Sequence, residues 1–319
     1  MSERVRANVH RLAVVQHPPV LLDLKASIRK ATRLMREAAK EGAELVTFPE
    51  TFLPGYPEWI WRLRPGEDHQ LSGDIHRRLT ENAVDLEAGG LEAVQRSAAK
   101  LGVVVVIGIN ELEGAFGRGT LYNTVVTIGA DGTLLNRHRK LMPTNPERMV
   151  WGLGDASGLR VVDTPVGRVG SLICWENYMP LARYALYAQG PDVYVAPTWD
   201  SGVHWINTIR HIATEGRVWV LGNGTAIRGS DVPADFPGRA ELFPDQDEWL
   251  NQGDSLVVAP SGDVVAGPLH EAYGILYADC DIATAAARRT LDVTGHYARP
   301  DIFKLEVVRE PSSPIRFSG

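Results

Sequence analysis

The sequence of 319 residues predicts an α/β fold built as a layered sandwich. Short apolar stretches typical of buried strands alternate with longer stretches in which apolar residues recur every three or four positions, as on one face of a helix. Two such series each end in two strands joined by a turn-forming tetrapeptide, at 129–132 and 260–263. Because no linker separates the two series, we expect one domain with internal pseudo-symmetry over residues 1–303. The tail at 304–319 is expected to dock at a subunit interface.

The first series is expected to contain three strands and three helices before its terminal hairpin. The strands are expected at 12–16, 44–48 and 103–109, and the helices at 23–40, 74–86 and 91–101. Almost every residue of the third strand is apolar, which indicates that both of its faces are covered. The second strand of the hairpin runs into a basic stretch, Arg-His-Arg-Lys, at 137–140.

The second series repeats this alternation. Its strands are expected at 169–173, 193–196 and 218–222, and its helices at 179–189 and 203–217. A Pro-, Asp- and Glu-rich stretch predicts an irregular loop at 230–252. A hairpin at 256–266 and a last helix at 282–291 complete the predicted elements.

Composition and charge argue against several classes of function. A chain with 44% hydrophobic and 23% charged residues has the make-up of an ordinary globular protein, and its net charge of -6 gives no reason to expect nucleic acid or an anionic membrane as a partner. Two cysteines cannot form a disulfide scaffold, which favours a reducing compartment. Residues 1–10 lack the apolar core of a signal peptide, and no apolar run approaches the ~18 residues of a membrane span. We therefore expect a cytoplasmic protein.

Cys174 stands where an apolar strand gives way to the polar turn Cys-Trp-Glu-Asn and then to a helix. A nucleophile on a sharp turn between a buried strand and a helix is a recurring arrangement in hydrolases. A lone cysteine is often a small packing residue, and Cys280, which has no such surroundings, fits that description better. Because only a small fraction of a free thiol is ionised at neutral pH, a nucleophilic Cys174 needs a base or a cation nearby.

Charged residues at two strand ends are candidates for these roles. Glu50 follows a strand in a stiff, apolar setting, and burial raises the pKa of a carboxyl toward the range of a general base. His138 and Lys140 share one face of their strand because side chains alternate, so Lys140 is expected to point inward and to stabilise developing negative charge. Glu147 is a further candidate, although Glu-Arg pairs in loops are common on surfaces.

The sequence contains no pattern typical of a metal or nucleotide site. The histidines include no pair at zinc-type spacing with a third ligand. Gly152 and Gly154 lack the strand-to-helix context and the third glycine of a dinucleotide motif. We expect neither a metal nor a cofactor.

Glu50, Lys140 and Cys174 occur in that order, each at a strand end, and resemble the catalytic triad of the carbon–nitrogen hydrolase superfamily. The sequences that flank them are most similar to those of its nitrilase branch. The segments that carry the resemblance are Phe-Pro-Glu-Thr-Phe-Leu-Pro-Gly-Tyr-Pro at 48–57, His-Arg-Lys-Leu-Met-Pro-Thr at 138–144, Trp-Gly-Leu-Gly-Asp at 151–155, Cys-Trp-Glu-Asn at 174–177 and Gly-His-Tyr-Ala-Arg-Pro-Asp at 295–301. The resemblance covers about residues 12–303.

The resemblance implies a four-layer α-β-β-α sandwich and homodimers that often build into spirals or filaments. It also implies hydrolysis of a nitrile, with water, to a carboxylic acid and ammonia. In this reaction Glu50 acts as general base and Cys174 as the nucleophile that forms a thioimidate and then a thioester. Lys140 would stabilise the developing negative charge, and Glu147 would be a supporting residue.

Six tryptophans fall in or beside the loops that carry these segments. Either they pack within the loops and at contacts between subunits, or they line the substrate pocket. In the second case aromatic or arylacetonitrile substrates are favoured, with aliphatic nitriles possible. We predict four residues to bind substrate, namely Tyr56, Trp151, Trp175 and Trp199. The alternatives are an amidase, an enzyme that acts on cyanide, or a nitrile-hydrating enzyme that stops at the amide. A different class is a non-catalytic filament-forming or binding protein on the same fold.

Overall fold

The computed structural model describes residues 8–64, 66–114, 119–283, 288 and 290–310. The strands are β1 (Val9–Gln16), β2 (Leu45–Thr47), β3 (Val84–Asp85), β4 (Val104–Leu112), β5 (Leu121–Ile128), β6 (Leu134–Arg139), β7 (Val162–Thr164), β8 (Gly167–Ser171), β9 (Val193–Thr198), β10 (Trp219–Gly224), β11 (Ala226–Arg228), β12 (Trp249–Val258), β13 (Val264–His270) and β14 (Gly274–Asp281). The α-helices are α2 (Leu24–Lys40), α3 (His69–Glu81), α4 (Glu92–Leu101), α5 (Pro180–Tyr187), α6 (Gly202–Gly216) and α7 (Arg239–Leu242).

The strands form two seven-stranded sheets. The first has the order β14-β1-β2-β4-β5-β6, with β3 paired to β4, and the second has the order β11-β12-β10-β9-β8-β7, with β13 paired to β12. In each half three parallel strands, β1, β2 and β4 or β8, β9 and β10, are followed by two antiparallel strands, which is the predicted internal pseudo-symmetry.

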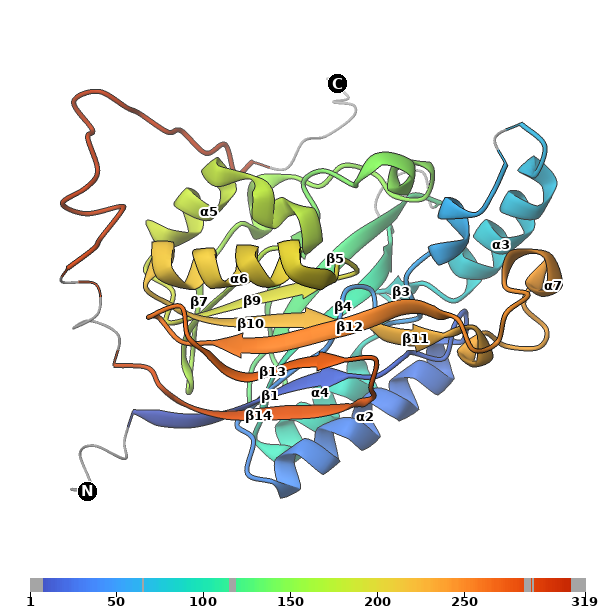
Figure 1. Cartoon of the computed structure of the whole chain (residues 1–319), viewed down its shortest axis with the longest axis horizontal. Helices are drawn as coiled ribbons and strands as arrows, with labels where there is room; N and C mark the ends of the chain where they lie inside the picture. Colours follow the sequence, from blue (N-terminus) through green and yellow to red (C-terminus); the bar gives the residue numbers. More distant parts are fainter. Residues whose placement is uncertain (1–7, 65, 115–118, 284–287, 289, 311–319) are drawn as a thin grey trace, which may run out of the picture.

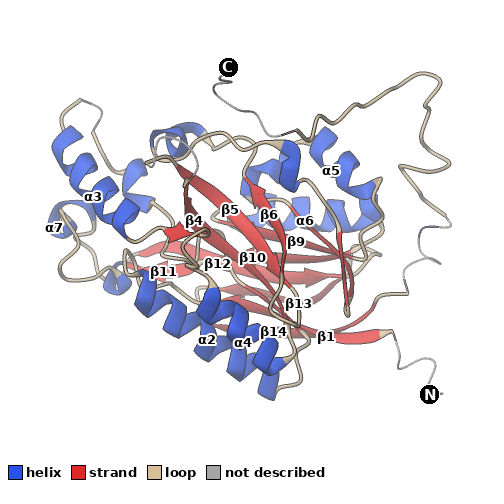
Figure 2. Cartoon of the chain, turned by 180° about the vertical axis from the view of Figure 1, so that it is seen from behind, coloured by secondary structure: helices blue, strands red, loops and turns tan. Residues whose placement is uncertain are grey.

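The two sheets pack face to face, and helices cover their outer faces (Figures 1 and 2). Apolar side chains of α2 and α4 pack on the first sheet, and those of α5 and α6 pack on the second. A third cluster lies between the sheets and takes side chains from both, including Leu12 and Val14 of β1 and Val193 and Val195 of β9. The predicted α-β-β-α sandwich is therefore confirmed.

Helix α2 illustrates how the sequence specifies these layers. Its buried side chains include Ala31, Leu34, Met35 and Ala38, which are three or four residues apart and so line one face. Asp23 precedes the helix, and its side chain accepts a hydrogen bond from the backbone N–H of Ala26, as an N-cap residue should. The helix ends at Lys40, so the predicted span of 23–40 is correct apart from the cap.

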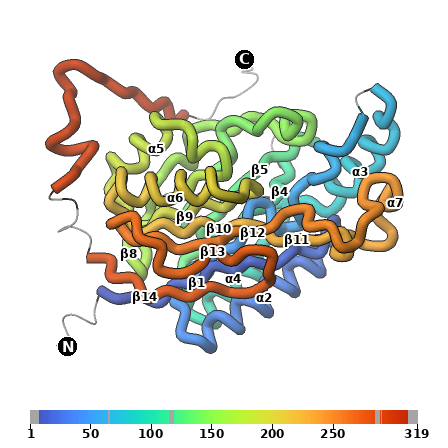
Figure 3. Tube along the Cα trace, viewed as in Figure 1, coloured from blue at the N-terminus to red at the C-terminus, as the bar shows by residue number. Residues whose placement is uncertain are grey.

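Two predictions of secondary structure are wrong in part, and one strand was not predicted. The helix expected at 74–86 begins earlier and ends at Glu81, because Val84 and Asp85 pair with β4 as a short strand. The loop expected at 230–252 contains α7, and its last residues already belong to β12, which begins at Trp249 and not at 256. Strand β14 has no counterpart in the prediction, although it pairs along the whole of β1 (Figure 3).

The remaining expectations concern the end of the chain. The helix expected at 282–291 falls largely on residues 284–287 and 289, which lie outside the described part of the chain. The described tail runs as an arm without helix or strand on the side of the molecule that carries α5 (Figure 1). None of the helices in the described segments is both long enough and apolar enough to cross a bilayer.

Candidate active site

Cys174 lies on a tight turn between the two sheets. Strand β8 ends at Ser171, two residues earlier than predicted, and a 3-10 helix, η4 (Cys174–Tyr178), begins at the cysteine itself. Cys174 has a φ of 50°, a left-handed conformation that is uncommon for a residue with a side chain. The side chain of Asn177 holds the turn by donating to the carbonyl oxygens of Leu172 and Cys174, at 3.1 and 2.8 Å.

Glu50 is buried and has three hydrogen-bond donors. It follows β2, and its Oε1 accepts from the side chain of Asn123 at 2.6 Å and from Nζ of Lys140 at 2.9 Å. Its Oε2 accepts from the backbone N–H of Trp199 at 2.7 Å. Burial raises the pKa of Glu50, and the positive charge of Lys140 opposes this rise.

Lys140 follows β6 and is also buried. As the strand alternation predicted, His138 and Lys140 point into the protein, whereas Arg137 is exposed. Nζ of Lys140 lies 2.9 Å from Oε1 of Glu50 and 2.7 Å from Oε2 of Glu147. Burial by itself lowers the pKa of Lys140, but the negative charges of Glu50 and Glu147 raise it above its ordinary value. Lys140 therefore keeps its positive charge.

Glu147 is part of the same network. It lies in a 3-10 helix, η2 (Asn145–Met149), whose first turn is closed by a hydrogen bond from the backbone N–H of Thr144 to Oε2 of Glu147, at 2.6 Å. Its other oxygen, Oε1, accepts from the phenol of Tyr56 at 2.7 Å. Both carboxylate oxygens thus have donors, and the group is fixed between Lys140 and Tyr56.

The charges of Glu50, Lys140 and Glu147 all affect the pKa of the Cys174 thiol. Burial raises its pKa most, Glu50 raises it further, and Lys140 and a hydrogen bond from the Thr198 hydroxyl oppose the rise. The sulfur is therefore a neutral thiol in the resting site, and it needs a base to become a nucleophile. Glu50, Cys174 and the segment that carries Lys140 and Glu147 are far apart in the sequence but meet at one place in the fold.

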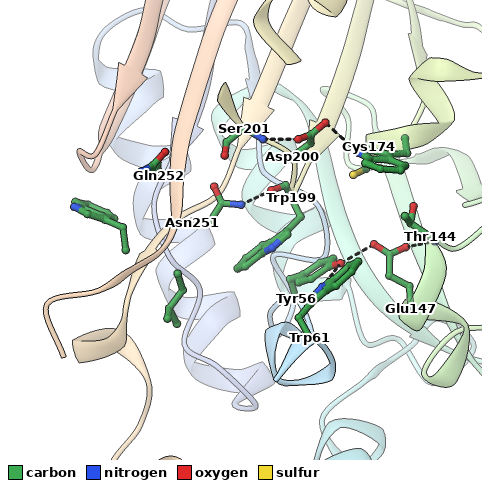
Figure 4. A pocket seen from close by; sticks show the side chains of 13 residues that line it. Tyr56, Trp61, Thr144, Glu147, Cys174, Trp199, Asp200, Ser201, Asn251 and Gln252 are labelled. Carbon is green, nitrogen blue, oxygen red and sulfur yellow. Dashed lines mark hydrogen bonds between the residues drawn. The ribbon is translucent and has the colours of Figure 1, made fainter. Parts of the chain in front are cut away.

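A cavity of about 300 Å³ opens onto Cys174 (Figure 4). This volume is at the lower end of the range for small-molecule sites. The lining residues are Tyr56, Trp61, Thr144, Glu147, Cys174, Trp175, Trp199, Asp200, Ser201, Trp249, Leu250, Asn251 and Gln252. Three of the four residues predicted to bind substrate, Tyr56, Trp175 and Trp199, are among them.

Trp151, the fourth predicted substrate-binding residue, does not line the cavity. Its indole is buried behind Tyr56, edge to face at 5.7 Å, and its N–H donates to the side chain of Asn110 at 2.9 Å. The backbone of Trp151 forms a bridge with Leu121 at the start of β5, and this pairing turns the ring into the protein. Trp151 supports the wall of the cavity from behind.

Several polar residues of the site were missed in the sequence. Asn123 is a polar residue inside an otherwise largely apolar strand, and this was the available signal. Thr198 and Asp200 follow the same strand-end rule that indicated Glu50, since β9 ends at Thr198. Glu176 was interpreted as a turn residue next to the cysteine.

Glu176 in fact connects two parts of the site. Its buried carboxylate accepts from the backbone N–H of Ile173, next to Cys174, at 2.7 Å, and from the backbone N–H of Leu141, next to Lys140, at 2.6 Å. The ring of His138 lies 3.1 Å from both of its oxygens. Glu176 therefore ties the lysine segment to the cysteine turn.

Comparisons with known proteins identify the family of the chain. The carbon-nitrogen hydrolase family profile matches residues 11–290. An aliphatic nitrilase of Sinorhizobium fredii (strain HH103) is 42% identical over 96% of this chain and 97% of its own length. The bifunctional nitrilase/nitrile hydratase NIT4A of Lupinus angustifolius is 39% identical over 100% of this chain and 92% of its own.

Solved structures show the same fold. Nit3 of Saccharomyces cerevisiae, a member of branch 10 of the nitrilase superfamily, superposes with a TM-score of 0.70 over 91% of this chain and 97% of its own, at 22% identity. The site geometry, the profile and the relatives lead to one conclusion: this chain belongs to the carbon–nitrogen hydrolase family and, within it, to the nitrilase branch.

Proposed function

We propose that this protein is a nitrilase that converts an organic nitrile and two waters into a carboxylic acid and ammonia. The observation that carries the proposal is the position of Cys174, a neutral thiol at the cavity and beside a buried Glu50–Lys140–Glu147 network. The names of relatives that are about 40% identical over nearly the whole chain support the nitrile as substrate.

In the first step Glu50 takes the proton of the Cys174 thiol while the sulfur attacks the nitrile carbon. The nitrile nitrogen then receives that proton, which leaves a covalent thioimidate and an ionised Glu50. Because the ordinary pKa values of a thiol and a carboxyl differ by about 4 units, this transfer is uphill by roughly 5–6 kcal/mol in water. The raised pKa of buried Glu50 and the fixed charge of Lys140 reduce that barrier, whereas burial of the thiol, which raises its pKa, adds to it.

In the later steps water adds to the thioimidate and ammonia leaves, which gives a thioester. A second water releases the acid and restores the thiol. Each addition places negative charge next to Lys140, which stays protonated throughout and stabilises the tetrahedral intermediates together with the backbone N–H of Trp175. Glu147 orients Lys140 through their 2.7 Å contact.

For the substrate, we propose an aromatic nitrile or an arylacetonitrile, with aliphatic nitriles as poorer substrates. The support is the number of rings around the cavity, which are those of Tyr56, Trp61, Trp175, Trp199 and Trp249. The rings of Tyr56 and Trp199 stack at 4.3 Å and form a flat apolar surface. Ammonia release from phenylacetonitrile, a short aliphatic nitrile and cyanide tests this preference.

A second product is part of the proposal, because four relatives are named bifunctional nitrilase/nitrile hydratase. If the tetrahedral intermediate expels the sulfur instead of ammonia, the product is the amide. Chromatography of acid and amide from one nitrile measures this branching. A chain that releases ammonia from amides faster than from nitriles would be an amidase instead.

The decisive test of the function is covalent chemistry at Cys174. Mass spectrometry after rapid quenching should find a substrate adduct on the peptide that contains Cys174, and Cys174→Ala should show neither adduct nor ammonia. The Cys280→Ala variant is the matched control, because Cys280 is buried at β14 without a partner network, and it should turn over normally. Absence of both adduct and turnover in the unmodified protein would favour a non-catalytic binding or filament-forming protein.

We also propose that the protein is cytoplasmic and that it self-associates as a homodimer, with larger spirals as a further step. Support for self-association comes from the exposed apolar side chains of α5 and the arm, such as Leu181 at 66% exposure and Phe303 at 75%. Sedimentation velocity of the protein and of its Leu181→Glu variant tests the dimer.

A further inference from the structure

Asp200 brings a carboxylate to the cavity next to the nucleophile. It lies two residues after β9, and its backbone N–H donates to the hydroxyl of Thr198 at 2.7 Å. Asp200 and Cys174 are both among the residues that line the cavity.

The hydrogen-bond donors to Asp200 are neutral groups. Its Oδ1 accepts from the backbone N–H of Ser201 at 2.9 Å. Its Oδ2 accepts from the indole of Trp175 at 3.0 Å and from the phenol of Tyr178 at 3.4 Å. Among the described residues no lysine, arginine or histidine side chain pairs with this carboxylate, so its charge is not neutralised by the protein there.

The other residues that line the cavity do not offset the negative charge of Asp200. Glu147 is the other carboxylate among the lining residues, and its charge is balanced by Lys140. No lysine or arginine belongs to the lining set, whereas four tryptophans, Trp175 and Trp199 among them, do. A carboxylate flanked by aromatic faces is a favourable setting for an organic cation and an unfavourable one for an anion.

We propose that Asp200 is a specificity-determining residue and that, among nitriles of the same size and shape, the cavity favours those that carry a protonated amine. The amine would lie against the Asp200 carboxylate and the tryptophan faces while the nitrile carbon reaches Cys174. This inference rests on the proposed nitrilase function for its kinetic test, but the recognition of the cation itself does not require turnover.

The alternative is that Asp200 serves only to hold Trp175 and the start of α6. The variant Asp200→Asn separates the two roles. Its side-chain oxygen still accepts one hydrogen bond, the shape is unchanged, and the negative charge is lost. Asp163→Asn is the matched control, because Asp163 lies on edge strand β7 with an exposed side chain and its change alters the net charge of the protein by the same amount.

The probes are three nitriles of the same chain length that differ at the far end: 5-aminopentanenitrile, hexanenitrile and 5-cyanopentanoate. They carry a positive charge, no charge and a negative charge at pH 7.5, since an alkyl amine has a pKa near 10 (about 10.4 for lysine) and a carboxylic acid one near 4 (about 4.3 for glutamate). We expect the unmodified protein to have a higher kcat/KM for the amine than for the acid. Asp200→Asn should lower the kcat/KM ratio of amine to hexanenitrile about tenfold and should raise the rate with the acid, whereas Asp163→Asn should change neither.

A binding measurement keeps this inference separate from the proposed function. Titration of Cys174→Ala with 5-aminopentanenitrile, followed by tryptophan fluorescence, should give a Kd at least fivefold lower than that of Cys174→Ala/Asp200→Asn. If no nitrile is turned over but this difference in Kd is found, the nitrilase function fails and the cation site stands. Equal amine-to-alkyl ratios and equal Kd values with and without the Asp200 charge would overturn the inference.

Discussion

Glu50 and Lys140 form an ion pair in which both side chains are buried, with Nζ 2.9 Å from Oε1. Removing one partner of a buried pair leaves an uncompensated charge and costs about 3–5 kcal/mol. Truncating either residue would therefore confuse loss of folding with loss of function, and tests of the site require variants that keep the shape of the side chain.

Glu50→Gln keeps the shape and removes the base. We expect kcat to fall by about 10²–10⁴, the usual contribution of general acid–base catalysis. Stopped-flow or quench measurements of adduct formation on Cys174 should show that the loss lies in the first step. Glu111→Gln is the control, since Glu111 is also a buried carboxylate but pairs with Arg139, which retains Glu113. A Glu50→Gln enzyme with more than a tenth of the unmodified rate would contradict the assigned role.

The pH dependence of kcat/KM should reflect the raised pKa of Glu50. Activity requires the ionised carboxylate, and burial raises its pKa above 4.5, so activity should rise with pH through a midpoint above 4.5. Since the pKa of Lys140 is raised above 10.5, its deprotonation should cause no loss between pH 8 and 10. Rates at pH 4–10, with activity rechecked after return to pH 8, measure this profile. An acid midpoint at or below 4.5 would be inconsistent with a buried base.

Glu176→Gln should weaken both the fold and the site. Burial acts to raise the pKa of Glu176, but His138 and the two backbone N–H donors lower it overall. A lowered folded-state pKa contributes stability above the unfolded value of 4.5, and this stability is lost as the pH falls through the folded value. At pH 7 we therefore expect the free energy of unfolding to decrease by about 1–3 kcal/mol. The difference between the variant and the unmodified protein should shrink at pH 4.

Urea unfolding at the two pH values checks the stability of Glu176→Gln, and kcat of the folded fraction checks the site. The control is Glu215→Gln, because Glu215 also has a lowered pKa but joins Arg183 and Tyr187 between α5 and α6. Glu215→Gln should lower the free energy of unfolding without lowering kcat. Equal kcat values for Glu176→Gln and Glu215→Gln would argue that Glu176 does not position Lys140 and Cys174.

Glu58 should give the opposite dependence of stability on pH. Burial raises its pKa to about 7, against the hydrogen bond and charge of Arg62. A raised folded-state pKa means that the stability is present below the unfolded value of 4.5 and is lost as the pH rises through about 7. The loss is at most about 3 kcal/mol. Thermal unfolding at pH 5.5 and 8.5 should therefore show a larger drop in Tm for the unmodified protein than for Glu58→Gln, in which Arg62 retains Glu248.

Local patterns in the sequence predicted most of the layers correctly. Helix α2, the fully covered strand β4 and the hairpin of β5 and β6 follow from periodicity and turn residues, which act over a few positions. The same is true of the inward direction of Lys140. Strand β14 was not predicted because its stability comes from pairing with β1, whose residues are 258 to 272 positions away, for example Gln16 with Gly274 and Val9 with Asp281.

In the candidate site, too, local patterns predicted one part and contacts between distant segments decided the other. The residue types and their places at strand ends made Glu50, Lys140 and Cys174 candidates, and the resemblance to the carbon–nitrogen hydrolases selected them among the alternatives. Whether a nearby side chain faces the cavity was decided by the packing of the two sheets. That packing placed Trp151 behind the wall of the cavity. It also brought Asn123 to Glu50, Thr198 to the thiol and Asp200 to the cavity. These contacts join segments far apart in the chain, and no local pattern records which distant strand ends will meet.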